Sequence, residues 1–245
     1  MLLAALLALA LQQPITSEAP SIMGALTQET VEIREDFAGT ELVLYGATRG
    51  LTIQDEIVVV LRGPEQDLRV MRKTRSFGIW INGSAREFQA VPRYYAIASS
   101  RPLEEIANEA ALVRNRIGLD HLLTRPGETP IAEMLEYRKA VERAGAREAL
   151  YASAPRGVEV LDGGLFRATL ALPPSTPVGN YTAEVYLFRD GRPVASRSTS
   201  LRVEKAGLER LIYEFAHGLP MVYGLFCVVL AMLAGWAGAA IFARR

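Results

Sequence analysis

The sequence predicts a mainly β protein: an immunoglobulin-like β-sandwich with a two-helix insertion, followed by an amphipathic helix and one C-terminal transmembrane helix. Three observations lead to this prediction. Short segments of alternating apolar and polar residues, separated by turn residues, occupy both halves of the middle of the chain. Between them, after Pro102, apolar residues recur at helical spacing. Near the C-terminus, residues 221–242 contain no charged side chain.

Composition sets the first limits. Half of the 245 residues are hydrophobic, which is enough for a packed core, and Lys plus Arg balance Asp plus Glu at 27 each. The balanced charge gives no overall field that would favour nucleic acid. Cys227 is the single cysteine and the two histidines, His121 and His217, are far apart, so the sequence offers no disulfide, no metal site and no cofactor motif.

The first half of the sandwich is predicted from short strands. In "ETVEIREDFAGTELVLYGA", Val31 and Ile33 alternate on one strand and Leu42 and Leu44 on the next, with a tight connection at Asp36–Gly39. Four further strands are predicted at Glu56–Leu61, Leu68–Met71, Phe77–Ile81 and Phe88–Val91. Turn residues separate them, notably Gly63–Pro64 and Asn82–Gly83.

The helical insertion is predicted over residues 102–147. One helix should run from Pro102 to Gly118, since Ile106, Ala110, Val113 and Ile117 recur at helical spacing. A second should begin at the favoured N-cap pair Thr129–Pro130 and end near Gly145.

Strands resume after Pro155. Two hairpins are predicted, with turns at Asp162–Gly164 and at Asp190–Gly191. Tyr181, two residues after a glycine at a strand entrance, matches the tyrosine corner of immunoglobulin-like sandwiches. One sandwich over residues 21–203 is more economical than two domains, because neither half alone would bury much surface.

The two ends predict the location of the protein. Residues 1–20 resemble a signal peptide with a cleavage site after Ala10, although a buried N-terminal helix is an alternative. Residues 204–220 predict a juxtamembrane amphipathic helix, which could instead dock on the sandwich. Residues 221–242 predict a transmembrane helix and residues 243–245 a cytoplasmic tail, because arginines stay on the cytoplasmic side. The expected location is therefore the inner membrane, single-pass, with the bulk in the periplasm and the C-terminus cytoplasmic.

Small residues recur at four-residue spacing in the predicted span. They would allow close transmembrane packing of helices, although ordinary small-residue content is an equally good explanation. The candidates are Ala234, Gly235, Gly238 and Ala239.

Few residues suggest chemistry. Asp120 and His121 are adjacent, but the chain lacks a Gly-x-Ser-x-Gly elbow, so no catalytic residue is assigned. The run "DLRVMRKTR" is interpreted either as an anionic-partner patch or as a solvated edge strand protected by charge. Its four cations are Arg69, Arg72, Lys73 and Arg75.

The stretch "VPRYYAIASSRPLEEIA" allows two interpretations. It is either the passage from a strand to a helix, or a polar cluster that binds an anion or a partner loop. The cluster would consist of Arg93, Tyr94, Ser99, Ser100 and Arg101. We expect only one of Tyr94 and Tyr95 to be buried in the sandwich, because neighbouring strand residues face opposite sides. Arg101 near a helix N-terminus should be offset by Glu104 or Glu105, or kept for an anionic ligand.

Three segments carry a resemblance: "DFAGTELVLYGA", "VPRYYAIASSRPLEEIA" and "YGLFCVVLAMLAGWAGAAIFARR". In this order they resemble an alphaproteobacterial family of transmembrane proteins of uncharacterised function. The resemblance implies a signal peptide, a periplasmic domain and a C-terminal membrane anchor, with no catalytic residues to carry over. It also suggests an association with sulfite-exporter-like permeases, beside which members are often encoded.

The expected function is therefore that of a membrane-anchored periplasmic accessory or interaction protein, associated with a sulfite-exporter-like permease. Its expected partners are the inner membrane and a membrane protein such as a permease, and not nucleic acid. Two alternatives stay open: a periplasmic hydrolase that uses His121, and a small-anion-binding module that uses the arginines named above.

Overall fold

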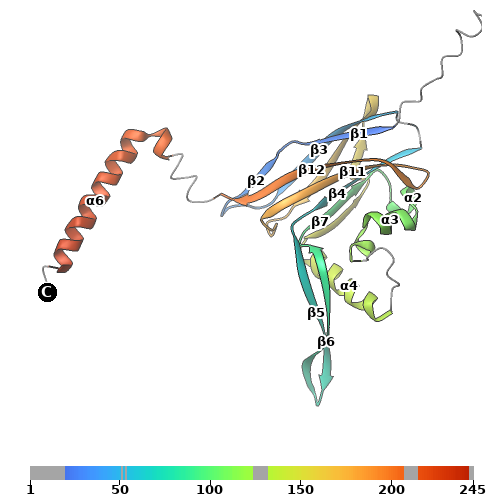
Figure 1. The fold of residues 1–245 in the computed structure, drawn as a ribbon, viewed down its shortest axis with the longest axis horizontal. Coiled ribbons are helices and arrows are strands. Elements are labelled where there is room, and N and C mark those ends of the chain that lie inside the picture. The colour runs from blue at the N-terminus through green and yellow to red at the C-terminus, as the bar shows by residue number, and fades with distance from the viewer. Residues whose placement is uncertain (1–19, 51, 53, 124–131, 207–214, 243–245) are drawn as a thin grey trace, which may run out of the picture. The chain divides into compact units, whose positions relative to one another are not determined.

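The computed structural model describes residues 20–50, 52, 54–123, 132–206 and 215–242, without the side chains of residues 132, 133, 237 and 239–242. The chain divides into two compact units. The first comprises Met1–Val31 with Asp36–Val203, and the second Glu32–Glu35 with Glu204–Arg245. The first unit contains the four-stranded sheet and most of the six-stranded sheet, and it is mainly β, as predicted (Figure 1).

One sheet has four antiparallel strands in the order β1-β3-β10-β9. They span Ser21–Leu26, Thr40–Arg49, Leu165–Leu172 and Val158–Val160. The other sheet has six strands in the order β2-β12-β11-β4-β7-β8. These span Thr30–Ile33, Arg192–Lys205, Gly179–Arg189, Asp55–Arg62, Tyr95–Ser99 and Tyr151–Pro155. The strands before and after Asp36–Gly39 therefore belong to different sheets.

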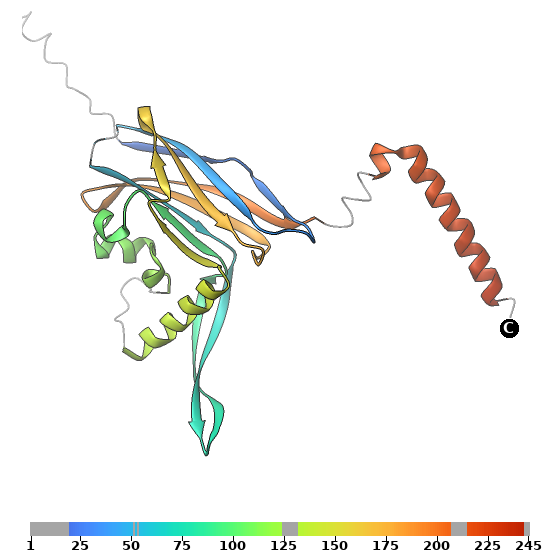
Figure 2. The same ribbon diagram turned by 180° about the vertical axis from the view of Figure 1, so that it is seen from behind.

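The helical segment connects two parallel strands. β7 and β8 pair in parallel, with Tyr95 opposite Tyr151, and such a pair needs a long crossover connection. The crossover contains α2 (Leu103–Ile106), α3 (Glu109–Asn115), a short 3-10 helix (Leu119–His121) and α4 (Ala132–Arg147). These helices lie over one face of the six-stranded sheet (Figure 2).

The core consequently has two layers. Ile57–Leu61 of β4 are all buried, because one face of the strand lies against the other sheet and the opposite face against the helices. Val58, Val60 and Ile97 belong to the cluster under the helices.

The predicted first helix is interrupted. Ala107 is extended and pairs with Gly191, and the Asn108 side chain then caps α3 by accepting the Ala111 N–H at 2.8 Å. The second helix extends two residues past Gly145 to Arg147, while its predicted start at Thr129–Pro130 lies outside the described residues.

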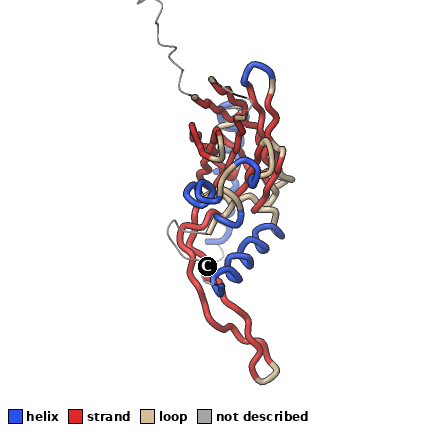
Figure 3. Tube along the Cα trace, turned by 90° about the vertical axis from the view of Figure 1, so that its right-hand side faces the viewer, coloured by secondary structure: helices blue, strands red, loops and turns tan. Residues whose placement is uncertain are grey.

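One long hairpin replaces three predicted strands. β5 (Glu65–Ser76) and β6 (Ile79–Pro92) pair along their length and form a separate two-stranded sheet that extends away from the sandwich (Figure 3). The turn is Phe77–Gly78, whose φ angles are both positive, and not Asn82–Gly83, since Asn82 pairs with Lys73 inside the ladder.

Two local predictions are confirmed. The hairpins β9–β10 and β11–β12 turn at Asp162–Gly164 and at Asp190–Gly191. The tyrosine corner is also present, because the buried Tyr181 hydroxyl donates to the Pro177 carbonyl at 2.6 Å.

The second unit contains α6, with helical backbone over Pro220–Phe242. Crossing a bilayer takes about 20 consecutive apolar residues. Within the described part of the chain, no helix meets the length and apolarity that such a crossing requires. This finding contradicts the predicted transmembrane helix at 221–242 and, with it, the single-pass inner-membrane localisation. The predicted signal peptide and cytoplasmic tail, and most of the 204–220 helix, lie outside the described residues.

Candidate functional site

A concave feature lies between α4 and β5, and we call it the α4–β5 groove. It consists of two adjoining hollows of about 380 Å³ each, which share Val70, Met71 and Ala140 in their lining. One continues toward the hairpin tip past Arg72, and the other toward Arg93 and Tyr151. Both walls belong to the first unit of the chain.

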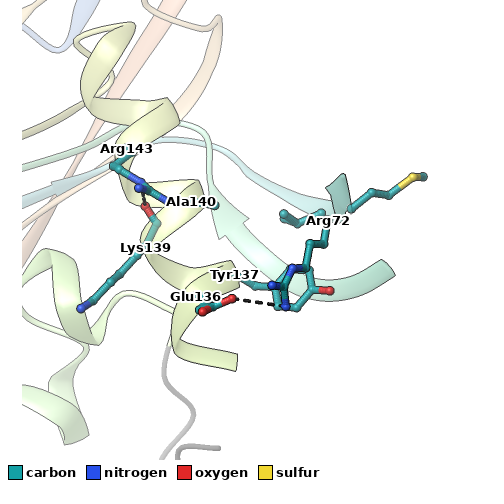
Figure 4. Close-up of a pocket in the computed structure, with 8 residues that line it drawn as sticks. Arg72, Glu136, Tyr137, Lys139, Ala140 and Arg143 are labelled. Atoms are coloured by element: carbon teal, nitrogen blue, oxygen red, sulfur yellow. Dashed lines mark hydrogen bonds and ion pairs between the residues drawn. The ribbon is translucent and has the colours of Figure 1, made fainter. Parts of the chain in front are cut away.

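The helical repeat of α4 creates one wall. Glu136, Ala140 and Arg143 recur three and four residues apart and therefore share a face, which lines the hollow nearer the tip (Figure 4). Tyr137 and Val141 on the same helix are buried and belong to the core cluster. The helix thus presents one face to the core while part of its surface lines the groove.

The tip-side end of the groove is held by contacts between α4 and both strands of the hairpin. The Tyr137 hydroxyl lies 2.7 Å from the Ser84 hydroxyl and donates to the Ser84 carbonyl at 3.1 Å. Arg72 forms an ion pair with Glu136 at 3.5 Å, and Figure 4 shows the two side chains pointing toward each other.

The opposite end is held by Tyr151 of β8. Its hydroxyl donates to the Pro92 carbonyl at 2.8 Å, and its ring lies against Gly145 of α4, where a Cβ atom would come within 2.3 Å of the ring. Burial, assisted by the nearby carboxylate of Glu142, raises the pKa of the Tyr151 phenol to about 12, so the hydroxyl stays protonated and can donate. Burial also raises the pKa of Glu142.

The lining of the groove combines apolar side chains with charged ones, and its charge is predominantly positive. Leu68, Val70, Met71 and Ala140 are apolar, and Met71 is 42% exposed. Seven lining residues carry a charge, five cations and two carboxylates: Arg69, Arg72, Arg93, Lys139, Arg143, Glu136 and Glu148. This composition suits an apolar segment that carries negative charge.

The candidate cluster from the sequence is divided between two places. Arg93 lines the groove before β7 begins, whereas Ser99 is buried near the end of that strand. The Ser100 hydroxyl donates to Glu56 at 2.5 Å and accepts the Ile57 N–H at 3.1 Å. The structure therefore separates Arg93 from the serines by the length of β7.

Arg101 is engaged by two carboxylates. Its Nε lies 2.7 Å from Glu56 and its Nη1 lies 3.8 Å from Glu105 in the first helical turn, which matches one of the two expected arrangements. Ser100 and Arg101 thus both contact the Glu56 carboxylate.

Tyr94 and Tyr95 are both fully buried, but on opposite sides. Tyr94 contacts β10 of the other sheet, as expected for one of the two, whereas Tyr95 belongs to the cluster under the helices. The Tyr94 hydroxyl donates to the Ala171 carbonyl at 2.6 Å, and burial raises the pKa of its phenol.

The basic run divides along β5. Arg69 and Arg72 line the groove, while Lys73 and Arg75 continue toward the tip. Sequence reasoning missed Lys139 and Arg143, whose only signal was their i, i+4 spacing on one face of a predicted helix.

The remaining candidates form no cluster with these residues. His121 Nε2 lies 3.6 Å from a carboxylate oxygen of Glu109. Among the residues that the structure describes, no three His, Cys, Asp or Glu side chains gather to hold a metal ion. Ala234, Gly235 and Gly238 lie on α6, and the side chain of Ala239 is outside the described part.

Comparison with known proteins identifies a family and finds weak similarity to solved structures. Residues 21–244 match the family described as "Putative transmembrane protein (Alph_Pro_TM)". No curated protein matches the chain. Among solved structures, the sporulation control protein Spo0M from Bacillus subtilis is 12% identical, with a TM-score of 0.28 that is too low to assign a shared fold. The similarity covers 82% of this chain and 56% of that one.

Proposed function

This chain belongs to the Alph_Pro_TM family, and we propose that it is a non-enzymatic accessory subunit that binds a partner protein through the α4–β5 groove. The observation on which the proposal rests is a groove between β5 and α4 that combines apolar side chains with mainly positive charge.

The shape of the groove supports binding of an extended segment. β5 pairs with β6 on one side, and no other strand among the described residues pairs with its opposite edge, so that edge has backbone groups outside the ladder. Such an edge can pair with an added strand, while neighbouring side chains select the sequence of that strand. The two hollows together extend along α4 from Glu136 to Gly145 and past its end to Glu148.

The charge of the rim specifies the partner chemistry. Lys139 and Arg143 on the helix and Arg69 on the strand favour a segment with acidic residues beside apolar ones. Complementary charge increases the association rate and selects against basic partners.

The groove is also preformed, which lowers the entropic cost of binding. The contacts of Tyr137 with Ser84 and of Tyr151 with Pro92 hold α4 against the rest of the unit at both ends of the groove. A partner would then bind without first having to order either wall.

The proposed partner is a permease of the sulfite-exporter-like class, or another component of the same complex. The resemblance of the chain to its family suggests this class, and the cationic rim requires an acidic segment on whichever component binds.

Co-purification tests the proposal. The tagged full chain, expressed in its native host and extracted in mild detergent, should retain a stoichiometric partner. Reversing charge at the rim with Lys139→Glu and Arg69→Glu should remove that partner. A matched control, Arg192→Glu with Arg197→Glu, makes the same charge change on the exposed surface of β12 and should retain it.

Either of two results would refute the proposal. One is the absence of a stoichiometric partner from every growth condition tested. The other is equal loss of the partner in the rim variant and the control, because the location of the charge would then be irrelevant.

A further inference from the structure

The distal part of the β5–β6 hairpin is chemically distinct from the groove at its base. Near the base, Phe88 and Val91 are buried and Leu68 and Val70 pack against the core cluster. At the tip, four large apolar side chains are exposed instead: Phe77 at 105%, Trp80 at 67%, Ile79 at 66% and Ile81 at 45%. Exposed apolar patches of this kind mark interaction sites.

The strand register distributes the apolar side chains over both faces of the ribbon. Ile79 lies opposite Ser76 and Ile81 opposite Thr74 on one face, while Trp80 lies opposite Arg75 on the other. Phe77 occupies the turn between them. A protein that docks on a sheet face needs apolar residues on that face alone, whereas a tip that is apolar on both faces suits immersion in an apolar medium.

Phe77 occupies a turn position whose backbone conformation disfavours a bulky residue. Phe77 and Gly78 have φ angles of 48° and 84°, so the two-residue turn places Phe77 in the left-handed region. Asn or Gly adopts that conformation with less strain than Phe. A bulky side chain held in a strained position is a reason to look for a function of the side chain itself.

Cations surround the apolar tip. Residues 68–86 contain five basic residues and no acidic one: Arg69, Arg72, Lys73, Arg75 and Arg86. Lys73 and Arg75 lie nearest the turn on β5, and Arg75 directly faces Trp80 across the ribbon. Trp and long basic side chains are the residues that position a protein at a membrane interface, where an apolar part is immersed and the cation meets lipid phosphate.

We propose that the tip of the β5–β6 hairpin inserts peripherally into the interface of an anionic lipid bilayer. Phe77, Trp80 and Ile79 enter the boundary between headgroups and acyl chains, and Lys73 and Arg75 bind the headgroup phosphates. The proposal is independent of partner binding in the groove, because it uses different residues.

Trp80 provides a local readout in the full chain. The sequence has two tryptophans, so Trp236→Phe leaves Trp80 as the single tryptophan, whose emission can be excited selectively over that of the tyrosines. With mixed vesicles of phosphatidylglycerol and phosphatidylcholine, Trp80 emission should shift to the blue and be quenched by brominated acyl chains. Pure phosphatidylcholine vesicles should produce a much smaller change.

Two variants test the two parts of the tip. Phe77→Asn creates the favoured Asn-Gly turn, so the hairpin should fold at least as well while vesicle binding weakens. Lys73→Gln with Arg75→Gln should weaken binding by about 30-fold, because each cation near an anionic surface contributes about fivefold. Leu161→Asn, which also replaces an exposed apolar residue beside a turn with Asn, should leave binding unchanged.

The measurements can overturn the proposal in two ways. It is wrong if Trp80 emission does not respond to anionic vesicles with which the chain co-sediments, since another part of the chain then makes the lipid contact. It is also wrong if Trp80 responds only to a co-purified protein, since the tip would then bind protein.

Discussion

Tyr94 and Tyr95 are adjacent in the chain, and their hydroxyl groups reach opposite layers of the molecule. Tyr94 donates to Ala171 on β10 of the other sheet. The Tyr95 hydroxyl donates to the backbone carbonyl of Arg116, the residue after α3, at 3.3 Å and accepts the Gly118 N–H at 2.9 Å. Both rings are fully buried, because the six-stranded sheet that β7 belongs to is covered on one face by the four-stranded sheet and on the other by the crossover helices.

This arrangement predicts unequal costs for removing the two hydroxyls. Tyr94→Phe should lower the free energy of unfolding by about 1 kcal/mol, because one buried hydrogen bond is lost. Tyr95→Phe should lower it by about 2 kcal/mol, since two bonds are lost and the Gly118 N–H is left without its acceptor. Urea unfolding measures both changes. Tyr45→Phe, at a half-exposed site, is the control and should change the free energy of unfolding by less than about 0.5 kcal/mol. An equal or reversed order would contradict the two-layer description.

The ion pair of Asp55 and Arg189 predicts a dependence of stability on pH. Arg189 donates to the two carboxylate oxygens at 2.6 and 2.8 Å, and these hydrogen bonds hold the pKa of Asp55 below its usual value. A lowered pKa in the folded state means that the stabilisation is complete above the unfolded pKa of about 3.9, and is lost as pH falls through the folded value.

Asp55→Asn should therefore lower the free energy of unfolding by about 2 kcal/mol at neutral pH. The difference from the unmodified chain should shrink as the pH falls below about 4. Urea unfolding midpoints over a pH series measure this difference, and Arg192→Gln serves as a control for loss of an exposed cation on the same hairpin. A difference that stays constant across the acid range would show that the charge of Asp55 is not responsible.

Replacing Gly145 with Ala should change the stability in the direction opposite to the usual effect of this substitution. Gly→Ala inside a helix normally stabilises by about 1 kcal/mol. At this position a Cβ atom would meet the Tyr151 ring at 2.3 Å, so Gly145→Ala should instead destabilise by about 1–3 kcal/mol. Thermal unfolding compares it with Ala146→Gly at the neighbouring exposed position, which should lose only the propensity difference. A more stable Gly145→Ala chain would disprove the close packing of α4 on β8.

Substitution of Arg101 should affect stability and not partner binding. Its guanidinium pairs with Glu56 and Glu105 and is about half exposed, so Arg101→Gln should cost less than about 1 kcal/mol of stability. The partner retained in co-purification should be unaffected. If Arg101→Gln folds with unchanged stability and yet loses the partner, the cluster of Arg93, Ser99, Ser100 and Arg101 regains its interpretation as a binding site.

Turn chemistry alone predicted some connections and not others. Asp190–Gly191 and Asp162–Gly164 turn where expected, because each joins strands that pair with one another directly. Asn82–Gly83 is an equally favourable local signal, but it lies within β6. Anchoring of Phe88 and Val91 in the core, together with pairing along all of β5, sets a register in which Phe77–Gly78 must turn.

The sequence by itself determined the β-rich character, the position of the helical segment, the β9–β10 and β11–β12 turns and the tyrosine corner. These follow from side-chain periodicity and turn conformation, which depend on residues close together in the chain. Only the tertiary structure decided that both faces of β4 and β7 are covered and that Arg93 and Arg101 are separated. It also decided that Arg69 and Lys139 line the same groove. The last two residues are far apart in sequence, and the parallel pairing of β7 with β8 is what returns α4 to the side of β5. Such pairing depends on the packing of the whole unit, which no local pattern encodes.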